Sequence, residues 1–230
     1  MSSARLIYAA ACAIVLVAFG GCSKGYQREY GKWAYVWFDG DGRQVRYLQD
    51  AKGKLTVLAH PKYAKTADNV YLGGVKIPGA DPATLEVVND AYSKDAKRAY
   101  CGSIPIPGAN PEEFRVLGGN TEPQFCSRAK PFENAVGPMP EVPPDLEIVG
   151  AQGWSTDGNN CYFGPTRLVG ARAESFKMLN AWYATDGEKV FCGHDLLEEA
   201  DAKTFRVSPR MLEAEDKNYT YSKATAKRKE

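Results

Sequence analysis

The sequence predicts a mainly all-β protein of tandem units of about 29 residues, stacked as hairpins or meanders with short helical turns in the links. Three observations support this fold class. An apolar-x-apolar mark recurs, aromatic residues recur at fixed places between the marks, and Gly or Asp turn signals separate them. The marks are Leu55-Thr56-Val57, Leu85-Glu86-Val87, Phe114-Arg115-Val116, Leu146-Glu147-Ile148, Phe176-Lys177-Met178 and Phe205-Arg206-Val207.

Each unit is expected to contain three short strands. The pairs Asp157-Gly158 and Asp186-Gly187 predict a two-residue hairpin turn between the first two strands, because both residue types tolerate positive φ. A second turn is expected at Gly73-Gly74 and its equivalents. In the link that follows, Asp81 with Pro82 behind it is typical of the start of one helical turn.

One such unit is too small to bury its apolar face, so neighbouring units are expected to stack. An aromatic residue at one fixed position would then form a column along the core. An open solenoid, a closed propeller-like ring and a curved sheet all remain compatible with the pattern. The column residues are Tyr71, Tyr100, Phe132, Tyr162, Phe191 and Tyr221.

The repeat resembles the DKNYY family of bacterial proteins. The last unit contains Asp216-Lys217-Asn218-Tyr219, with Tyr221 at the second aromatic position. The resemblance covers about residues 45–221, although a third unit at about 120–148 is longer and Pro-rich, and the middle units have Asp-Gly in place of Asp-Lys-Asn. The resemblance implies a repeat scaffold in secreted or envelope proteins and no defined activity.

The N-terminus is typical of a secretory signal. Arg5 precedes an apolar run of 16 residues up to Gly21, which is shorter than the roughly 18–20 residues needed to span a bilayer. The end of the run, Phe19-Gly20-Gly21-Cys22, resembles the lipobox of bacterial lipoproteins, in which the cysteine is lipidated. By the same resemblance, Ser23 favours the outer membrane, with the protein facing the periplasm.

Four segments follow from this reading: a signal peptide at 1–21, a lipidated N-terminus and linker at 22–31, a repeat domain at 32–221 and a disordered basic tail at 222–230. Removal of the signal leaves 28 basic and 28 acidic side chains, so the acyl chains at Cys22 would provide the membrane anchoring. The aromatic segment at 32–38 is either an N-terminal cap or a degenerate first unit.

Four cysteines remain after Cys12 in the signal and Cys22 at the lipid are set aside. An even number in an exported protein suggests disulfides, and spacing alone allows three pairings. The repeat register favours one pair between Cys101 and Cys126, and another between Cys161 and Cys192.

Composition argues against several functional classes. A formal net charge of +1 lacks the basic footprint of a nucleic-acid binder. Zinc clusters and His-based triads are hard to build from His60 and His194, which are predicted to be loop residues. The sequence Asp39-Gly40-Asp41-Gly42 has the start of a calcium loop but lacks the Gly and Glu that the loop needs later, so it is interpreted as a turn. The repeated Asp residues are likewise interpreted as turn formers rather than metal ligands.

The sequence therefore favours a non-enzymatic, lipid-anchored scaffold that binds an envelope protein and needs no cofactor. The alternative is a glycan-binding module for peptidoglycan or surface polysaccharide. Its stacking residues would be Trp33, Trp37 and Trp182, which fall outside the aromatic column. An enzyme of unknown type is a third hypothesis, because carboxylates and tyrosines are plentiful.

Overall fold

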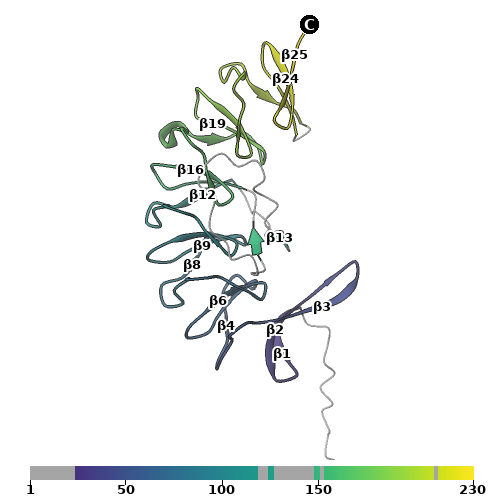
Figure 1. Ribbon diagram of the computed structural model, residues 1–230, viewed down its shortest axis with the longest axis vertical. Helices are drawn as coiled ribbons and strands as arrows, with labels where there is room; N and C mark the ends of the chain where they lie inside the picture. The colour runs from purple at the N-terminus through teal and green to yellow at the C-terminus, as the bar shows by residue number, and fades with distance from the viewer. Residues whose placement is uncertain (1–23, 119–123, 127–147, 151–152, 210–211) are drawn as a thin grey trace, which may run out of the picture.

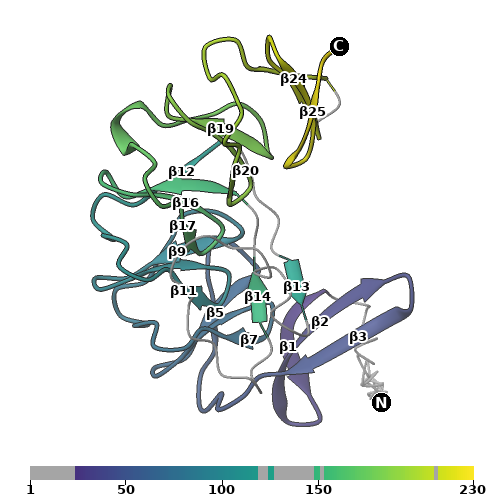
Figure 2. The same cartoon turned by 45° about the horizontal axis from the view of Figure 1, so that its top comes forward.

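The computed structural model confirms the all-β repeat class. Four-stranded antiparallel sheets, five within the described residues, stack into a curved column that follows a three-stranded N-terminal sheet (Figures 1 and 2). Each sheet is a meander in which strands pair in chain order. The structure describes residues 24–118, 124–126, 148–150, 153–209 and 212–230.

The strands are short. The N-terminal sheet has β1 (Gly25–Glu29), β2 (Lys32–Asp39) and β3 (Gly42–Tyr47). The first two units have β4 (Thr56–Val57), β5 (Tyr63–Lys65), β6 (Val70–Leu72) and β7 (Val75–Lys76), then β8 (Glu86–Val87), β9 (Tyr92–Lys94), β10 (Ala99–Cys101) and β11 (Ile104–Pro105). The third has β12 (Arg115–Leu117), β15 (Trp154–Thr156), β16 (Cys161–Phe163) and β17 (Thr166–Arg167). The last two have β18 (Lys177–Met178), β19 (Tyr183–Thr185), β20 (Val190–Cys192) and β21 (Asp195–Leu196), then β22 (Arg206–Val207), β23 (Glu213–Glu215), β24 (Tyr219–Ser222) and β25 (Thr225–Arg228).

A unit has four strands rather than the three predicted. In the second and fourth units, the run from the apolar mark to the next aromatic residue is broken by an asparagine turn. In the second unit, Asn89 Oδ1 accepts the backbone N–H groups of Ala91 and Tyr92 at 2.9 and 2.8 Å. This side chain competes with strand pairing and reverses the chain between β8 and β9.

The predicted two-residue Asp-Gly hairpin is wrong. Residues 157–160 form a four-residue turn between β15 and β16, in which Gly158 (φ 88°) supplies the positive φ. The two-residue turn at Gly73-Gly74 is confirmed, since β6 ends at Leu72 and β7 begins at Val75. The link also turns as expected, because Asp81 Oδ1 accepts the N–H of Ala83 at 2.8 Å, and the equivalent link of the third unit contains the 3₁₀ helix η2 (Ala173–Ser175).

The third unit differs from the one predicted at about 120–148. Strand β12 pairs directly with β15, so its sheet is complete around an insertion at residues 118–153. Within this insertion, β13 (Gln124–Cys126) pairs with β14 (Ile148–Gly150) as a separate two-stranded sheet. The mark ending at Ile148 is therefore not the first strand of a unit. The predicted column residue Phe132 lies outside the described residues.

The aromatic column is confirmed at its five described positions. Each column residue packs into the core of the preceding unit, so every core is closed by the next unit in the chain. Tyr100, for example, is buried against Tyr63, Leu72 and Ile77 of the first unit. Burial of one such side chain stabilises by roughly 1.5–3 kcal/mol relative to exposure. The buried positions are Tyr71, Tyr100, Tyr162, Phe191 and Tyr221.

The N-terminal sheet is a cap. Because β1 begins at Gly25, the linker predicted at 22–31 is wrong over most of its length. Side chains from one face of this sheet, Tyr26 and Tyr35 among them, pack with Tyr71 of the first unit. The approach is close at Gly74, where a Cβ atom would lie 2.9 Å from the Tyr35 Cβ.

The predicted disordered tail at 222–230 is also wrong. Residues Thr225–Arg228 form β25, the edge strand of the last sheet, and Ala226 packs against the core that contains Tyr221. The segment looks like a polar tail because only one side of this strand meets the core. The exposed Lys227 and Arg228 on this edge strand also oppose pairing with other chains.

Deletion of residues 224–230 should therefore lower the free energy of unfolding by about 2–4 kcal/mol, since it removes several backbone hydrogen bonds and uncovers part of the last core. Urea denaturation measures the change, with deletion of Glu230 alone as the control. If both deletions leave the unfolding midpoint unchanged, the segment contributes nothing to the fold.

Candidate interaction surface

The turn aspartates of the repeat join neighbouring units. In the third unit, Asp157 Oδ1 accepts the backbone N–H groups of Asn159 and Asn160 at 3.1 and 2.7 Å. Asp157 Oδ2 accepts the Tyr162 hydroxyl at 2.7 Å and the N–H of Asn110 at 3.0 Å. Asn110 lies in the link from the preceding unit, so one carboxylate holds its own turn, its own column residue and its neighbour.

The same arrangement recurs along the chain. Tyrosine also donates to the aspartate in the second and fifth units, whereas Phe191 leaves Asp186 without this bond in the fourth. The bonds to the preceding link are from the N–H of Asp81 to Asp95 (3.0 Å), of Arg172 to Asp186 (3.1 Å) and of Asp201 to Asp216 (2.8 Å).

These carboxylates are ionised structural groups. Burial by itself would raise the pKa of Asp157, but hydrogen bonds from Tyr162, Asn110 and Asn160 outweigh it and lower the pKa. The pKa values of Asp95, Asp186 and Asp216 are lowered in the same way. Both carboxylate oxygens have partners, as the turn interpretation requires. Across the described part of the chain, no group of three or more His, Cys, Asp or Glu side chains could hold a metal ion.

A second set of contacts, which the sequence analysis missed, joins the units at the first residue of the second strand. The Tyr92 hydroxyl donates to the carbonyl of Gly153 at 3.1 Å, and the Tyr183 hydroxyl donates to that of Leu212 at 2.9 Å. Trp154 Nε1 donates to Asn180 O at 3.0 Å at the same register position. The sequence does carry a signal for these contacts, because an aromatic residue recurs at this position, 29 residues apart at Trp154 and Tyr183.

The structure does not contain the predicted bridge between Cys161 and Cys192. Both thiols are buried, and each lies in a different core. Cys161 is the first residue of β16, whereas Cys192 is the third residue of β20. This offset is about 6.6 Å along a strand, which is more than the Cβ separation of a disulfide. Cys101 is buried, and its predicted partner side chain at Cys126 lies outside the described residues, as does the lipid site at Cys22.

Two of the tryptophans singled out from the sequence lie on one face of β2 as predicted. Trp33 packs in the cap core, and its Nε1 donates to Gly53 O at 3.0 Å. The Arg46 guanidinium lies 4.7 Å from the ring centre of Trp37. Both side chains are half-buried, and both have a guanidinium over the ring, because Arg28 covers Trp33.

Trp182 lies apart from these two residues. Its ring is 6.3 Å from that of Phe163 and packs between the cores of the third and fourth units. His194 is in the β20–β21 turn, 6.0 Å from the same Phe163 ring. The three tryptophans therefore do not form one surface.

The remaining sequence candidates are in loops. His60 Nδ1 lies 3.3 Å from Asp90 Oδ1, which joins the equivalent loops of the first and second units. Asp39 Oδ1 accepts the N–H of Asp41 at 3.0 Å, which confirms the turn interpretation of that acidic segment.

One column of side chains lies on the solvent side of the stacked units. In each of the five four-stranded sheets, the middle residue of the apolar-x-apolar mark is exposed and lies on an edge strand. These residues change in charge along the stack: the first is neutral, the second is acidic and the last three are basic. Exposed apolar side chains, Val57 (46%) and Met178 (36%), come next in two of these strands. We call this set the first-strand column: Thr56, Glu86, Arg115, Lys177 and Arg206.

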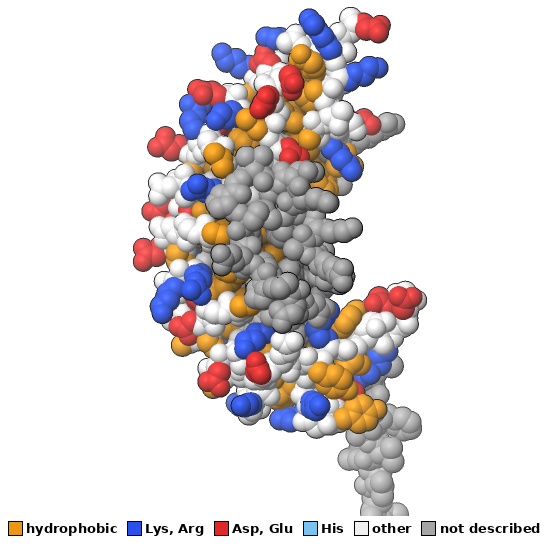
Figure 3. Space-filling model, in the orientation of Figure 1, with side chains coloured by type: hydrophobic (Ala, Val, Ile, Leu, Met, Phe, Trp, Pro, Cys, Tyr) orange, Lys and Arg blue, Asp and Glu red, His pale blue; other side chains and the backbone are white. Residues whose placement is uncertain are grey.

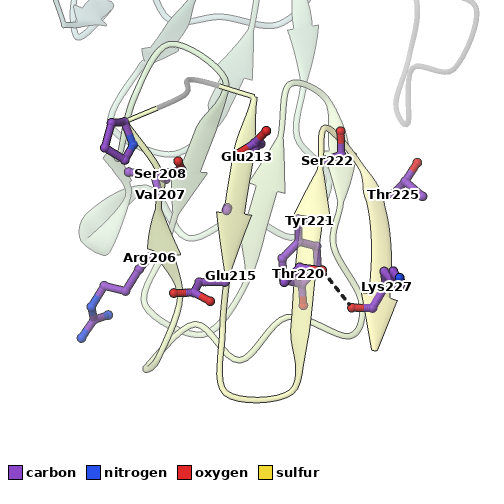
Figure 4. A pocket seen from close by; sticks show the side chains of 12 residues that line it. Arg206, Val207, Ser208, Glu213, Glu215, Thr220, Tyr221, Ser222, Thr225 and Lys227 are labelled. Carbon is purple, nitrogen blue, oxygen red and sulfur yellow. Dashed lines mark hydrogen bonds between the residues drawn. The ribbon is translucent and has the colours of Figure 1, made fainter. Parts of the chain in front are cut away.

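The column of units ends in a polar face. A hollow of about 610 Å³ lies on the last sheet, with Glu213 and Glu215 on β23 and Lys227 on β25 (Figure 4). In the preceding unit the equivalents of Glu213 and Lys227 are the buried Tyr183 and Leu197. A polar outer face at the end of the stack is typical of a capping unit.

The fold and its unit-to-unit contacts define a stacked β-repeat protein. The model of the DKNYY family matches residues 63–225, which is more than half of the chain, and the chain belongs to this family. The match begins at β5, so the N-terminal cap lies outside it. No curated protein and no solved structure matches the chain. Among the described residues, no helix is long and apolar enough to cross a membrane.

The hydrogen bond from the column tyrosine to the turn aspartate should contribute measurably to the free energy of unfolding. Tyr162→Phe should lower the free energy of unfolding by about 1–3 kcal/mol, because it removes a hydrogen bond to a charged group. Phe191→Tyr should raise it by about 1 kcal/mol, because it supplies the bond that Asp186 lacks. Denaturant unfolding measures both, and equal effects of the same sign would contradict the assignment.

The thiols of Cys161 and Cys192 should be unreactive in the folded protein. Burial is the main cause that raises the pKa of Cys161 to about 12 and that of Cys192 to about 11, and only the thiolate is nucleophilic. Both should react with maleimide after unfolding without reductant, as measured by peptide mass spectrometry. Two thiols that stay unlabelled until reductant is added would show that the bridge forms.

Proposed function

We propose that this protein is a non-enzymatic, lipid-anchored repeat protein of the bacterial envelope that binds a protein partner along the first-strand column. The observation that carries the proposal is the contrast between constant and varied positions within one chain. The turn aspartate recurs in the second to fifth units and the aromatic column in all five, whereas the exposed residues at 56, 86, 115, 177 and 206 change from neutral to acidic to basic.

A regular stack places equivalent residues in a line, and such lines are the surfaces that repeat proteins use for binding. The column is neutral or acidic at its start, at Thr56 and Glu86, and basic from Arg115 onward. This charge pattern suits a partner with acidic side chains opposite the last three units. The nearby exposed Met178 would add apolar contact area.

Binding rather than chemistry is also supported by how the reactive groups are used. In each of the four turn aspartates, one oxygen accepts N–H groups of its own turn and the other accepts an N–H of the preceding link. The thiols of Cys161 and Cys192 are buried, and burial holds each pKa far above neutral pH. These groups serve the framework.

Membrane attachment is supported by the sequence before the cap. The segment that ends in Cys22 has the lipobox pattern, and Ser23 favours the outer membrane. The N-terminal cap begins at Gly25, so the lipid would be attached directly beside the folded body. We place the protein at the outer membrane, facing the periplasm.

A protein partner is favoured over a glycan by the tryptophans. Sugar rings stack on open aromatic faces, whereas the rings of Trp33 and Trp37 are covered by Arg28 and Arg46. Trp182 packs between two cores.

The test is co-sedimentation of the mature chain, produced as Cys22→Ser so that it carries no lipid, with washed Gram-negative envelope fragments. Half of the fragments are stripped with protease beforehand, which leaves glycan. Retention only on untreated fragments is expected. Equal retention on both halves would contradict the proposal and favour the glycan-binding alternative.

A matched pair of triple variants locates the surface. Arg115→Glu, Lys177→Glu and Arg206→Glu together reverse the basic part of the first-strand column and should abolish retention. Lys97→Glu, Lys203→Glu and Lys227→Glu reverse three exposed charges elsewhere and should leave it unchanged. Loss of retention in both variants would point to overall charge rather than to this column.

A further inference from the structure

We propose that the N-terminal cap is also a membrane-contact surface, which binds anionic phospholipid headgroups and orients the repeat column on the membrane. We call its residues the basal face: Tyr30, Lys32, Lys52 and Lys54, all exposed. The proposal rests on the lipid anchor of the proposed function and adds a second contact beside it.

Chain length places the cap at the membrane. Gly25 is three residues after Cys22, and three extended residues reach about 10 Å. Strand β1 adds five residues, or about 17 Å, before the turn at Tyr30. A lipid at Cys22 therefore keeps the whole cap near the bilayer surface, and Tyr30 meets that surface when β1 lies along it.

Charge distinguishes this end from the rest of the chain. Residues 24–54 contain seven Lys or Arg and four Asp or Glu, a net charge of +3. The mature chain is balanced, so residues 55–230 carry a net charge of −3. An anionic surface attracts the cap and repels the remainder, which favours a column standing away from the membrane. Figure 3 shows hydrophobic and basic side chains together at the lower end of the cap, whereas acidic side chains gather at the tip of the β2–β3 hairpin.

Tyr30 is presented in an unusual way. Its side chain is 94% exposed, and its φ of 48° lies in the left-handed region that bulky residues rarely adopt. The turn is held by Arg28, whose Nη1 donates to Gly31 O at 2.7 Å. A fixed, exposed tyrosine at a hairpin tip suits the membrane interface, where an apolar ring and a polar hydroxyl are both accommodated.

Contacts bring the lysines to the same end. The Arg28 guanidinium lies 4.5 Å from the ring centre of Trp33, and Trp33 donates to the carbonyl of Gly53. Gly53 stands between Lys52 and Lys54 and lines a hollow of about 340 Å³ together with Lys65. The exposed Lys52 and Lys54 can offer their ammonium groups to a phosphate headgroup at this hollow, whereas Lys65 Nζ donates to the carbonyl of Pro82 at 2.6 Å.

The test uses the lipidated mature protein in vesicles and measures amide hydrogen exchange by mass spectrometry. One set of vesicles contains phosphatidylethanolamine with phosphatidylglycerol, and the other contains phosphatidylcholine alone. In the anionic vesicles, exchange at residues 30–32 and 52–54 should slow by about tenfold, and high salt should restore it. Exchange in the last turn, at Lys223, should not change. Equal exchange in both vesicle types would overturn the proposal.

The matched variants are Lys52→Glu with Lys54→Glu, which should abolish the slowing, and Lys203→Glu with Lys227→Glu, which should retain it. Slowing that survives the first pair would overturn the role of the basal face. The mass of the extracted protein reports the lipid independently. A lipidated protein without slowing contradicts this inference alone, whereas an unlipidated protein contradicts the lipid anchor and this inference together.

Discussion

Each turn aspartate divides one carboxylate between two neighbouring units, and the regular stacking of the chain depends on this shared group. One oxygen accepts backbone N–H groups of the turn before the third strand. The other oxygen accepts a backbone N–H from the link that leaves the preceding unit, as Asp157 does from Asn110. The strands are too short to stabilise a sheet alone. The same aspartate side chain therefore sets the local turn geometry and the contact with the preceding unit.

The two edges of the stack are joined by different chemistry. At one edge, aspartates accept backbone N–H groups from the preceding unit. At the other edge, Tyr92, Trp154 and Tyr183 donate to backbone carbonyls of the following unit. Between them, each core is closed by one aromatic residue of the next unit. The side chains of the first-strand column make none of these contacts between units, so their charge can change along the stack. The cap covers one end of the stack, and the polar face of the last sheet forms the other end.

The repeat length, the all-β class and the buried aromatic column could be predicted from the sequence because they depend on apolar spacing. The asparagine turns could not, since Asn89 and Asn180 act through side-chain bonds that no apolar period reveals. The insertion misled the count of units because Leu146-Glu147-Ile148 imitates a mark by composition alone. The last strand has the composition of a polar tail because β25 is polar on its exposed side. The family adds no activity, so the first-strand column could be recognised only after the stack placed its residues in line.

The most direct test is the pH dependence of unfolding of the wild type and Asp157→Asn. The folded-state pKa of Asp157 is lowered, so its stabilising contribution is complete above the unfolded pKa of about 3.9 and is lost as pH falls below it. The account predicts that the variant is less stable at pH 7 and that the two free energies of unfolding converge in acid. Parallel curves, or equal stability at pH 7, would contradict the role of the shared carboxylate.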